Sequence, residues 1–298
     1  MDKIHIPVLL KESLDSLGII PNGFYIDGTL GDGGHSIEIL KKLSKNGLLL
    51  SIDQDQHAID FVQSYYKHNL SQNWVISKSN FAKIDEVVKK FEKDRLPDGI
   101  LLDIGLSSRQ LEESHNRGFS YQEENEPLDM RMDDELGVTA KDLLNAFSEK
   151  ELARIFWSYG EEKYSKRISR EIKKNISNIN TVGDLTRLIY KAVPAADKST
   201  YKNPSRRVFQ ALRIVVNDEL GSLQKGLDNS FKILNKNGRL SVITFHSLED
   251  RIVKNYFLEK SRSGEGRLLF QKYVAPTDFE ERINPRSASA KLRTLIKI

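Results

Sequence analysis

The hydrophobic positions of the chain up to about residue 104 form short apolar runs, separated by segments in which apolar residues recur at helical intervals. The runs at 23–27, 47–53, 74–77 and 99–104 predict buried strands, and helical spacing is clear from Ile84 to Phe91. Strands that alternate with helices of this length predict a parallel sheet with right-handed crossover connections.

The alternation breaks after the fourth predicted strand. Residues 105–138 are polar and predict a loop, whereas 139–193 predict helices throughout. A helix start at Asn203-Pro204-Ser205 opens a predicted long helix near 205–234. Later elements predicted from the pattern are a strand at 239–245, a helix at 248–257, and last strands at 268–274 and 292–298. We therefore predict an α/β sheet domain, residues 1–108 and 209–298, interrupted by a mostly helical insertion at 109–208.

Composition places the chain among ordinary globular proteins. Of 298 residues, 39% are hydrophobic, which is enough for a core, yet no apolar run is long enough to span a membrane. The first residues show no signal-peptide pattern, so we expect a cytoplasmic protein. The absence of cysteine excludes disulfides, zinc–thiolate sites, iron–sulfur clusters and cysteine nucleophiles. The six histidines have no ligand spacing, and we predict no metal site.

The formal net charge of +4 says little by itself, but the basic residues are clustered. They gather between Lys163 and Arg213 and again after Glu281, whereas acidic residues gather from Glu123 to Glu135. Clustered cations suit a phosphate backbone. The alternative is a solvated helix face whose charges pair with the acidic segment.

A glycine-rich turn follows the first predicted strand. In Asp27-Gly-Thr-Leu-Gly-Asp-Gly-Gly-His35 the glycine spacing differs from the G-x-G-x-x-G turn that cradles a pyrophosphate. Glycines allow positive φ and a close approach of backbone to a ligand, and the carboxyl edge of an open α/β sheet is where such ligands bind. The turn therefore predicts a binding site for a ligand that need not carry a phosphate.

Acidic and aromatic residues follow the next three strands. Asp53 ends the second strand at the interval expected for a ribose contact, although Asp53 and Asp55 are also placed to cap a helix. Phe81, after the third strand, is suited equally to an adenine contact and to a plain core position. Asp103 ends the fourth strand, as a cleft acceptor or as a turn aspartate.

Taken together, these residues resemble the bacterial small-subunit ribosomal RNA methyltransferase H family, also called MraW. The resemblance extends nearly from end to end. It rests on blocks at His5–Leu10 with Glu12, Tyr25–Thr29, Gly31, Gly33–His35, Asp53, Asp103–Ser108 with Gln110, Arg117–Ser120, Pro127–Met132, Asn203–Arg207, Phe209–Ile214, Asn217, Glu219–Leu220, Phe245–Arg251 and Asn284–Ser287.

The resemblance implies a class I S-adenosylmethionine-dependent methyltransferase fold with a helical insertion. It implies methylation of the N4 amino group of a cytidine in the decoding region of 16S ribosomal RNA, with naked RNA or the assembled small subunit as the partner. The cofactor contacts that it implies are Gly33, Gly34, His35, Asp53, Phe81, Asp103 and Gln110.

The chemistry of such a reaction limits which side chains are candidate catalytic groups. Methylation of cytosine C5 needs a covalent nucleophile, usually cysteine, whereas an exocyclic amine attacks directly and needs a hydrogen-bond acceptor. Asp103, a hydroxyl of Ser107 or Ser108, and His246 are the candidate catalytic groups. The Asp/Asn-Pro-Pro-aromatic tetrad of many amino-methylating enzymes is replaced here by Asp103-Ile-Gly-Leu106.

The insertion is predicted to recognise RNA, with Arg206, Arg207 and Arg213 on its phosphates. Two other functions stay open at this point. One is a non-catalytic RNA-binding assembly factor that keeps a relic cofactor pocket. The other is a nicotinamide oxidoreductase, which the glycine spacing and the basic insertion disfavour.

Overall fold

A computed structural model describes residues 7–112, 116–195 and 204–298. Contacts divide the chain into two compact units, Met1–Ser107 with Leu220–Ile298 (the sheet unit) and Ser108–Glu219 (the helical unit). The sheet unit contains α1 (Leu10–Leu17), β1 (Phe24–Asp27), α2 (Gly34–Lys42), β2 (Leu48–Asp53), α3 (Gln56–Tyr65), β3 (Trp74–Lys78), η1 (Phe81–Lys83), α4 (Ile84–Phe91), β4 (Gly99–Asp103), α11 (Glu219–Ile233), β5 (Arg239–Thr244), α12 (Ser247–Arg262), β6 (Gly266–Leu268), α13 (Asp278–Ile283), η4 (Pro285–Ser289) and β7 (Lys291–Lys297).

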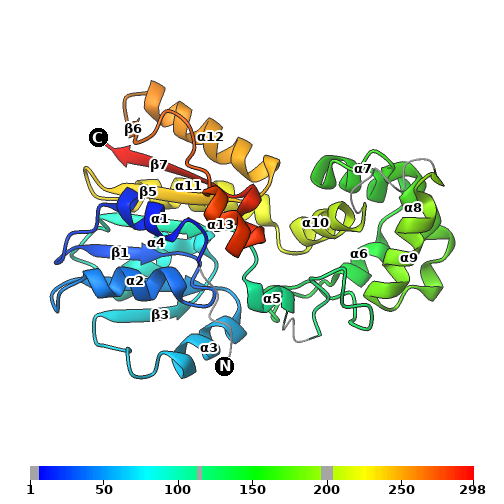
Figure 1. The fold of residues 1–298 in the computed structure, drawn as a ribbon, viewed down its shortest axis with the longest axis horizontal. Helices are drawn as coiled ribbons and strands as arrows, with labels where there is room; N and C mark the ends of the chain where they lie inside the picture. The colour runs from blue at the N-terminus through cyan, green and yellow to red at the C-terminus, as the bar shows by residue number, and fades with distance from the viewer. Residues whose placement is uncertain (1–6, 113–115, 196–203) are drawn as a thin grey trace. The chain divides into compact units, whose positions relative to one another are not determined.

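The sheet has seven strands in the order β3-β2-β1-β4-β5-β7-β6 (Figure 1). Strands β1 to β5 pair in parallel, as the sequence predicts, whereas β7 is antiparallel to both β5 and β6. The chain builds outward from β1 to β3 and then crosses back to β4, so the order reverses between β1 and β4. In open α/β sheets such a reversal opens a binding crevice at the carboxyl ends of the strands.

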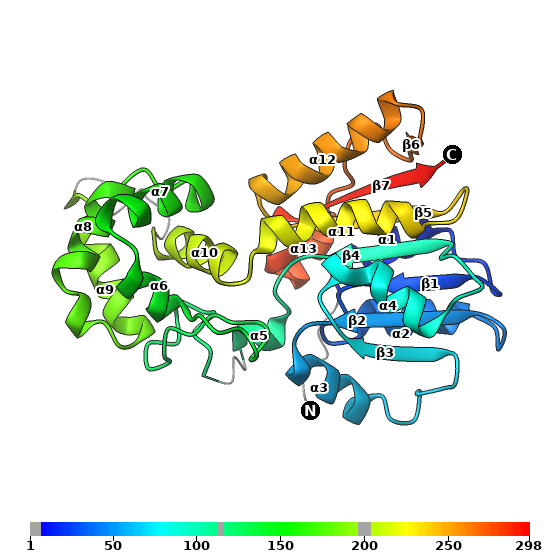
Figure 2. The same cartoon turned by 180° about the vertical axis from the view of Figure 1, so that it is seen from behind.

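Helices cover both faces of the sheet, and the strands supply a core to each. Successive strand residues point to opposite faces. Phe24 and Ile26 share a core with residues of α4, α11 and α12, whereas Tyr25 shares a core with residues of α1, α2 and α3. Figure 2 shows α4 and α11 in front of the sheet, with α2 behind it. The strands are therefore apolar on both faces, which is why they appear in the sequence as continuous hydrophobic runs.

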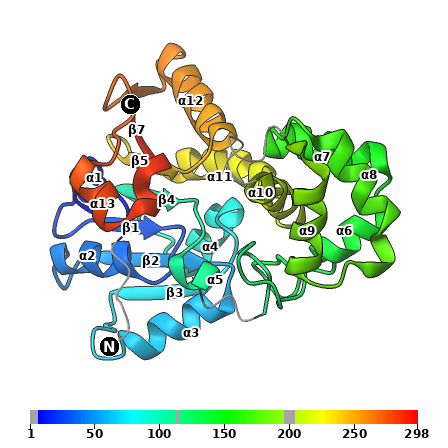
Figure 3. The same ribbon diagram turned by 45° about the vertical axis from the view of Figure 1, so that its right-hand side comes forward.

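The helical unit is held together by helix packing (Figure 3). Capping boxes begin three of its helices, at Thr139, Ser148 and Thr181, and confirm the predicted helical region. Gly160 of α7 lies against the backbone carbonyl of Arg207 of α10, an approach that a larger side chain would block. Its elements are α5 (Ser108–Glu112), α6 (Ala140–Ala146), α7 (Glu149–Gly160), α8 (Ser165–Lys174), η2 (Ile176–Asn178), α9 (Val182–Ala192) and α10 (Pro204–Val216).

The single long helix predicted near 205–234 is wrong, because the structure has two helices there, α10 and α11. Asp218 adopts φ 47°, a left-handed conformation that ends α10. The side chain of Asn217 donates to the carbonyl of Met130 at 2.8 Å and accepts from the backbone N–H of Met132 at 2.8 Å. Since α10 belongs to the helical unit, the chain returns to the sheet unit at Leu220 and not at the predicted position 209.

The strand predicted at 268–274 is also wrong over most of its length. Leu268 pairs with Leu295 and Val274 bridges to Leu292, so the five residues between the pairings on one side face two on the other. The intervening residues therefore bulge out of the ladder. Tyr273 in this bulge places its ring 4.9 Å from the Lys291 ammonium, a cation–π contact that the strand pattern does not reveal.

Among the described residues, the structure contains no helix with the length and hydrophobicity needed to cross a membrane.

Candidate active site at the carboxyl edge of the sheet

Three neighbouring strands end in aspartate where the strand order reverses. Asp27 ends β1, Asp53 ends β2 and Asp103 ends β4. In the register of the sheet, Asp27 lies beside Ser51 and Leu101. Asp53 and Asp103 therefore extend two residues beyond Asp27 on either side of it. We call these three residues the acidic cluster.

Asp53 holds the glycine-rich turn in place. Its carboxylate accepts from the backbone N–H of Gly31 at 2.8 Å and from that of Asp55 at 2.9 Å. Asp55, not Asp53, caps α3, because its side chain accepts from the N–H of His57. The two roles that the sequence left open for this pair are thus divided between the two residues. Each carboxylate oxygen of Asp53 keeps a further lone pair for a ligand hydroxyl.

Asp27 is completely buried and lies at the end of a chain of hydrogen bonds. Its carboxylate accepts from the hydroxyl of Ser36 at 2.7 Å and from the N–H of Thr29 at 3.2 Å. Ser36 Oγ lies 2.7 Å from Ser51 Oγ, which accepts from the Trp74 indole. Because the Ser36 proton goes to Asp27, Ser51 must donate to Ser36. Every donor in the chain is therefore directed toward one carboxylate.

The backbone N–H of Asp103 is hydrogen-bonded, whereas one oxygen of its carboxylate has no hydrogen-bond partner in the described structure. Its N–H donates to Thr29 Oγ1 at 2.7 Å, which ties β4 to the glycine turn. Its Oδ2 lies 3.7 Å from Nδ1 of His35 in α2. Its Oδ1 is buried and has no hydrogen-bond partner in the described structure. A buried acceptor without a partner is costly, so Oδ1 is suited to receive a donor from a ligand.

Burial raises the pKa of all three carboxyls. The pKa of Asp27 rises to about 7, although Ser36 and Thr29 lower it, and that of Asp53 rises to about 6. The pKa of Asp103 rises to about 7 through burial and then through the charge of Asp27. Like charges at close range oppose one another's ionisation. Near neutral pH this edge of the sheet is thus able to exchange protons.

The raised pKa of Asp27 makes stability depend on pH. A carboxyl whose folded pKa lies above its unfolded value stabilises the fold below the unfolded pKa and loses that contribution as the pH rises through the folded value. Asp27→Asn does not titrate. Relative to wild type, its free energy of unfolding should therefore rise by about 2–3 kcal/mol between about pH 5 and about pH 8. Urea unfolding of both proteins at several pH values measures this, and parallel pH curves would contradict it.

The glycines predicted to contact a cofactor form the turn into α2. Gly33 adopts φ 79°, and a Cβ there would meet Tyr66 and Val62 at 3.0 Å. Gly34 begins α2, and a Cβ there would collide with Pro7. Phe81 of η1 is half-buried, and a Cβ on Gly226 of α11 would collide with its ring. Phe81 thus packs against the core, and its contact with adenine stays a prediction.

His246 ends up as a helix cap. It precedes α12, and its Nδ1 accepts from the N–H of Glu249 at 3.4 Å, while Glu249 accepts from the N–H of His246 at 3.1 Å. Nε2 lies 2.9 Å from Glu249 Oε1 without hydrogen-bond alignment. This is a structural role, and a catalytic one stays a prediction. The side chain of Ser108, which begins α5, lies outside the described residues.

The remaining predicted residues belong to the helical unit. Gln110 lies in α5 and is buried. Arg206 and Arg207 lie in the first turns of α10, exposed and half-buried respectively. The guanidinium of Arg213 donates to both carboxylate oxygens of Glu219, at 2.6 and 3.1 Å. Arg213 would have to leave this ion pair to reach a phosphate. Of the predicted pairing between basic and acidic segments, the structure shows Arg187 with Glu124 at 3.7 Å.

Asp27 and Thr29 belong to the predicted glycine-rich turn, but the sequence pattern assigns neither residue a role of its own. Asp27 carries the buried charge and Thr29 connects the turn to Asp103. The available signal was the recurrence of aspartate at the last position of strands, which Asp27 shares with Asp53 and Asp103. The strand order that brings the three together was not available from the sequence pattern.

A sheet of this order, with a glycine turn after β1 and acidic residues at the reversal point, is that of a class I methyltransferase. The sequence matches the MraW methylase family over residues 2–298, and the chain belongs to that family. It is 45% identical to a ribosomal RNA small subunit methyltransferase H of Clostridium botulinum (strain Loch Maree / Type A3), with 100% of both chains covered. The corresponding protein of Heliobacterium mobile is 44% identical over 100% of both chains. Among solved structures, an rRNA methylase from Streptococcus thermophilus aligns over 99% of both chains with 10% identity and a TM-score of 0.46.

Proposed function

We propose that this protein transfers a methyl group from S-adenosylmethionine to the N4 amino group of a cytidine in the decoding region of 16S ribosomal RNA. One observation carries the site assignment: the buried, unpartnered Oδ1 of Asp103 at the reversal point of the sheet. Family membership supports the reaction class, since the full-length relatives are named small-subunit ribosomal RNA methyltransferases.

The residues present suit the cofactor. The turn at Gly31 and Gly33 has positive φ at both positions, so backbone can approach a ligand without a side chain between them. Asp53 has lone pairs left for ribose hydroxyls, and Asp103 has a free acceptor oxygen. When bound, S-adenosylmethionine supplies an electrophilic methyl group on a positively charged sulfur. Gly34, His35, Phe81 and Gln110 complete the set of proposed cofactor contacts.

The substrate amine is itself the nucleophile, so what the protein must supply is a hydrogen-bond acceptor for its N–H. An exocyclic amine delocalises its lone pair into the ring, and a carboxylate that accepts its N–H localises that pair for attack. Asp103 is our candidate for this acceptor, and Ser108 and His246 rank below it. Positioning supplies much of the rate of such a transfer.

The two alternative functions are not favoured. A nicotinamide oxidoreductase would not be expected among full-length matches to a methylase family. A non-catalytic assembly factor would not need to keep a buried acceptor without a partner, because such a group destabilises the fold.

The direct test is mass spectrometry of nucleosides from small-subunit ribosomal RNA, prepared from cells with and without this protein. We expect N4-methylcytidine to disappear from the decoding region when the protein is absent and to return with the wild-type gene. An unchanged level would refute the proposal. Incubating purified protein and labelled cofactor with naked 16S RNA or with assembled small subunits identifies the true partner. Because that partner is ribosomal, we propose that the reaction takes place in the cytoplasm.

Arg206 and Arg207 are proposed to contact RNA phosphates. Reversing both charges, by Arg206→Glu with Arg207→Glu, should lower RNA affinity by about tenfold or more and reduce the salt slope of binding by about one to two. Filter binding over a range of salt concentrations measures both quantities. The matched control reverses Lys41 and Lys42, two exposed cations at the end of α2. Equal salt slopes for the two double variants would contradict this phosphate-contact assignment.

A further inference from the structure

The acidic cluster gathers negative charge where the proposed function requires a cation. The charge of Asp53 raises the pKa of Asp27, and the charge of Asp27 raises that of Asp103. Glu249 of α12 acts on Asp103 in the same direction, and Asp55 does so on Asp53. These carboxyl groups oppose one another's ionisation. One positive charge bound among them favours the ionised form of each.

Below the Asp103 pKa of about 7, the His35–Asp103 pair holds a proton when no ligand is bound. His35 Nε2 lies 3.1 Å from the carbonyl oxygen of Val8. A carbonyl only accepts, so Nε2 carries a hydrogen and donates. Nδ1 then directs either a lone pair or a second proton toward Asp103 Oδ2, 3.7 Å away. A lone pair facing an ionised carboxylate would be repelled, so below that pKa one proton resides on the imidazole or on the carboxyl.

We infer that the acidic cluster selects the sulfonium of S-adenosylmethionine over the neutral thioether of S-adenosylhomocysteine, and that binding of the sulfonium expels the proton of the His35–Asp103 pair. The inference rests on the proposed function and names the physical basis of its cofactor choice. Methyl transfer turns the bound cation into a neutral product. The carboxylates that attract the sulfonium therefore make no charge–charge interaction with the thioether of S-adenosylhomocysteine. This favours exchange of the product for fresh cofactor.

Linkage gives the sign of the pH effect. Below the Asp103 pKa of about 7, cation binding must release a proton, so affinity for the cation rises with pH by at most about tenfold per pH unit. Above that pKa no proton remains to be released and the affinity levels off. The thioether carries no charge and leaves the proton where it is, so its affinity stays nearly constant.

Calorimetric titration of the full chain tests this without measuring turnover. The ligands are S-adenosylmethionine, S-adenosylhomocysteine and sinefungin, whose amine replaces the sulfonium. Each is titrated from about pH 5.5 to about pH 7.5, and because all three ligands carry the same α-amino group, its ionisation at about pH 7.7–8.0 affects them alike. Two buffers of different ionisation enthalpy report the protons released. We expect release and rising affinity for the two cationic ligands, and neither for S-adenosylhomocysteine.

Two variants that replace a carboxyl with a neutral amide distinguish an effect of the acidic cluster from an effect on folding. Asp27→Asn removes the charge of the completely buried Asp27 and keeps the size of its side chain, and it leaves one oxygen to accept from Thr29 N–H or the Ser36 hydroxyl. At about pH 7.5, above the Asp27 pKa of about 7, it should lower the preference for S-adenosylmethionine over S-adenosylhomocysteine by about tenfold, while thioether affinity stays near wild type and verifies the fold. The matched control is Asp98→Asn, at the opposite edge of the sheet, where the carboxylate accepts from Phe24 N–H at 2.9 Å. It should leave the preference unchanged.

Parallel pH profiles for cationic and neutral ligands would overturn the inference, as would an Asp27→Asn variant with the wild-type preference. Failure of all three ligands to bind the folded protein would overturn the proposed function, and the inference with it. The two failures are therefore distinguishable.

Discussion

Replacing Asp103 with alanine is expected to abolish methyl transfer, with a loss of about a thousandfold or more in kcat/KM. The carboxylate is proposed both to accept the substrate amine and to contribute charge to the cofactor site. Its Oδ1 has no other partner, so no internal hydrogen bond at that atom is lost with it. Its N–H remains available to Thr29 in the alanine variant. Transfer of labelled methyl groups to small-subunit RNA measures the effect.

The control for this prediction is Asp98→Ala, which removes a carboxylate from the other edge of the same sheet. It should keep turnover within a few-fold of wild type at a temperature where both variants are folded. Near-normal turnover by Asp103→Ala would remove Asp103 as the acceptor and leave Ser108 and His246 as the candidates.

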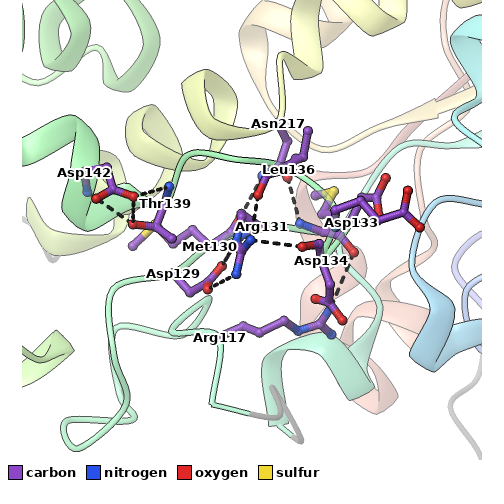
Figure 4. A network of polar contacts seen from close by, with 12 residues as sticks. Arg117, Asp129, Met130, Arg131, Asp133, Asp134, Leu136, Thr139, Asp142 and Asn217 are labelled. Carbon is purple, nitrogen blue, oxygen red and sulfur yellow. Dashed lines mark hydrogen bonds and ion pairs between the residues drawn. The ribbon is translucent and has the colours of Figure 1, made fainter.

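The second large effect is expected in the helical unit, where Arg131 organises the loop before α6 (Figure 4). Its guanidinium makes a two-pronged ion pair with Asp129, at 2.8 Å to each carboxylate oxygen. It also donates to the carbonyls of Asp134 and Leu136, at 3.0 and 2.6 Å. Arg131→Ala leaves the Asp129 charge and two carbonyls without this partner. We expect a loss of about 3 kcal/mol in the free energy of unfolding.

Denaturant unfolding followed by circular dichroism measures that loss. The matched control is Arg187→Ala, which removes ion pairs with Asp184 at 2.6 Å and Glu124 at 3.7 Å. Because Arg187 is mostly exposed, its removal should cost less than about 1 kcal/mol. Equal losses for the two variants would show that the contacts of Arg131 add nothing beyond a surface pair.

The elements of the sheet were predictable because their signal is local. Strands buried on both faces give uninterrupted apolar runs, and the runs that predict β1, β2, β4 and β5 end within one residue of the observed strands. Roles decided by side-chain direction were not predictable. Asp53 and Asp55 are two positions apart and equally suited to capping α3, and only the fold shows which one points toward Gly31.

The failures share a physical cause, which is contact between residues far apart in the chain. Residues 205–234 are a good helical sequence, yet Asn217 uses its side chain for backbone groups of Met130 and Met132. Likewise, residues 269–273 are a plausible strand, yet they bulge out between the pairings of Leu268 with Leu295 and of Val274 with Leu292. In each case a tertiary interaction outweighs a local preference, and no pattern within the segment reveals its partner.

The position of β7 has a consequence for how the molecule is made. Residues 291–297 are the last strand in the chain, yet they lie between β5 and β6 and not at an edge. As the polypeptide leaves the ribosome, the helical unit is complete long before this strand emerges. Until then β5 presents unpaired backbone groups, which invite association with other chains. The sheet is therefore incomplete until β7 pairs with β5, and the protein is most prone to misassembly during the late stages of its synthesis.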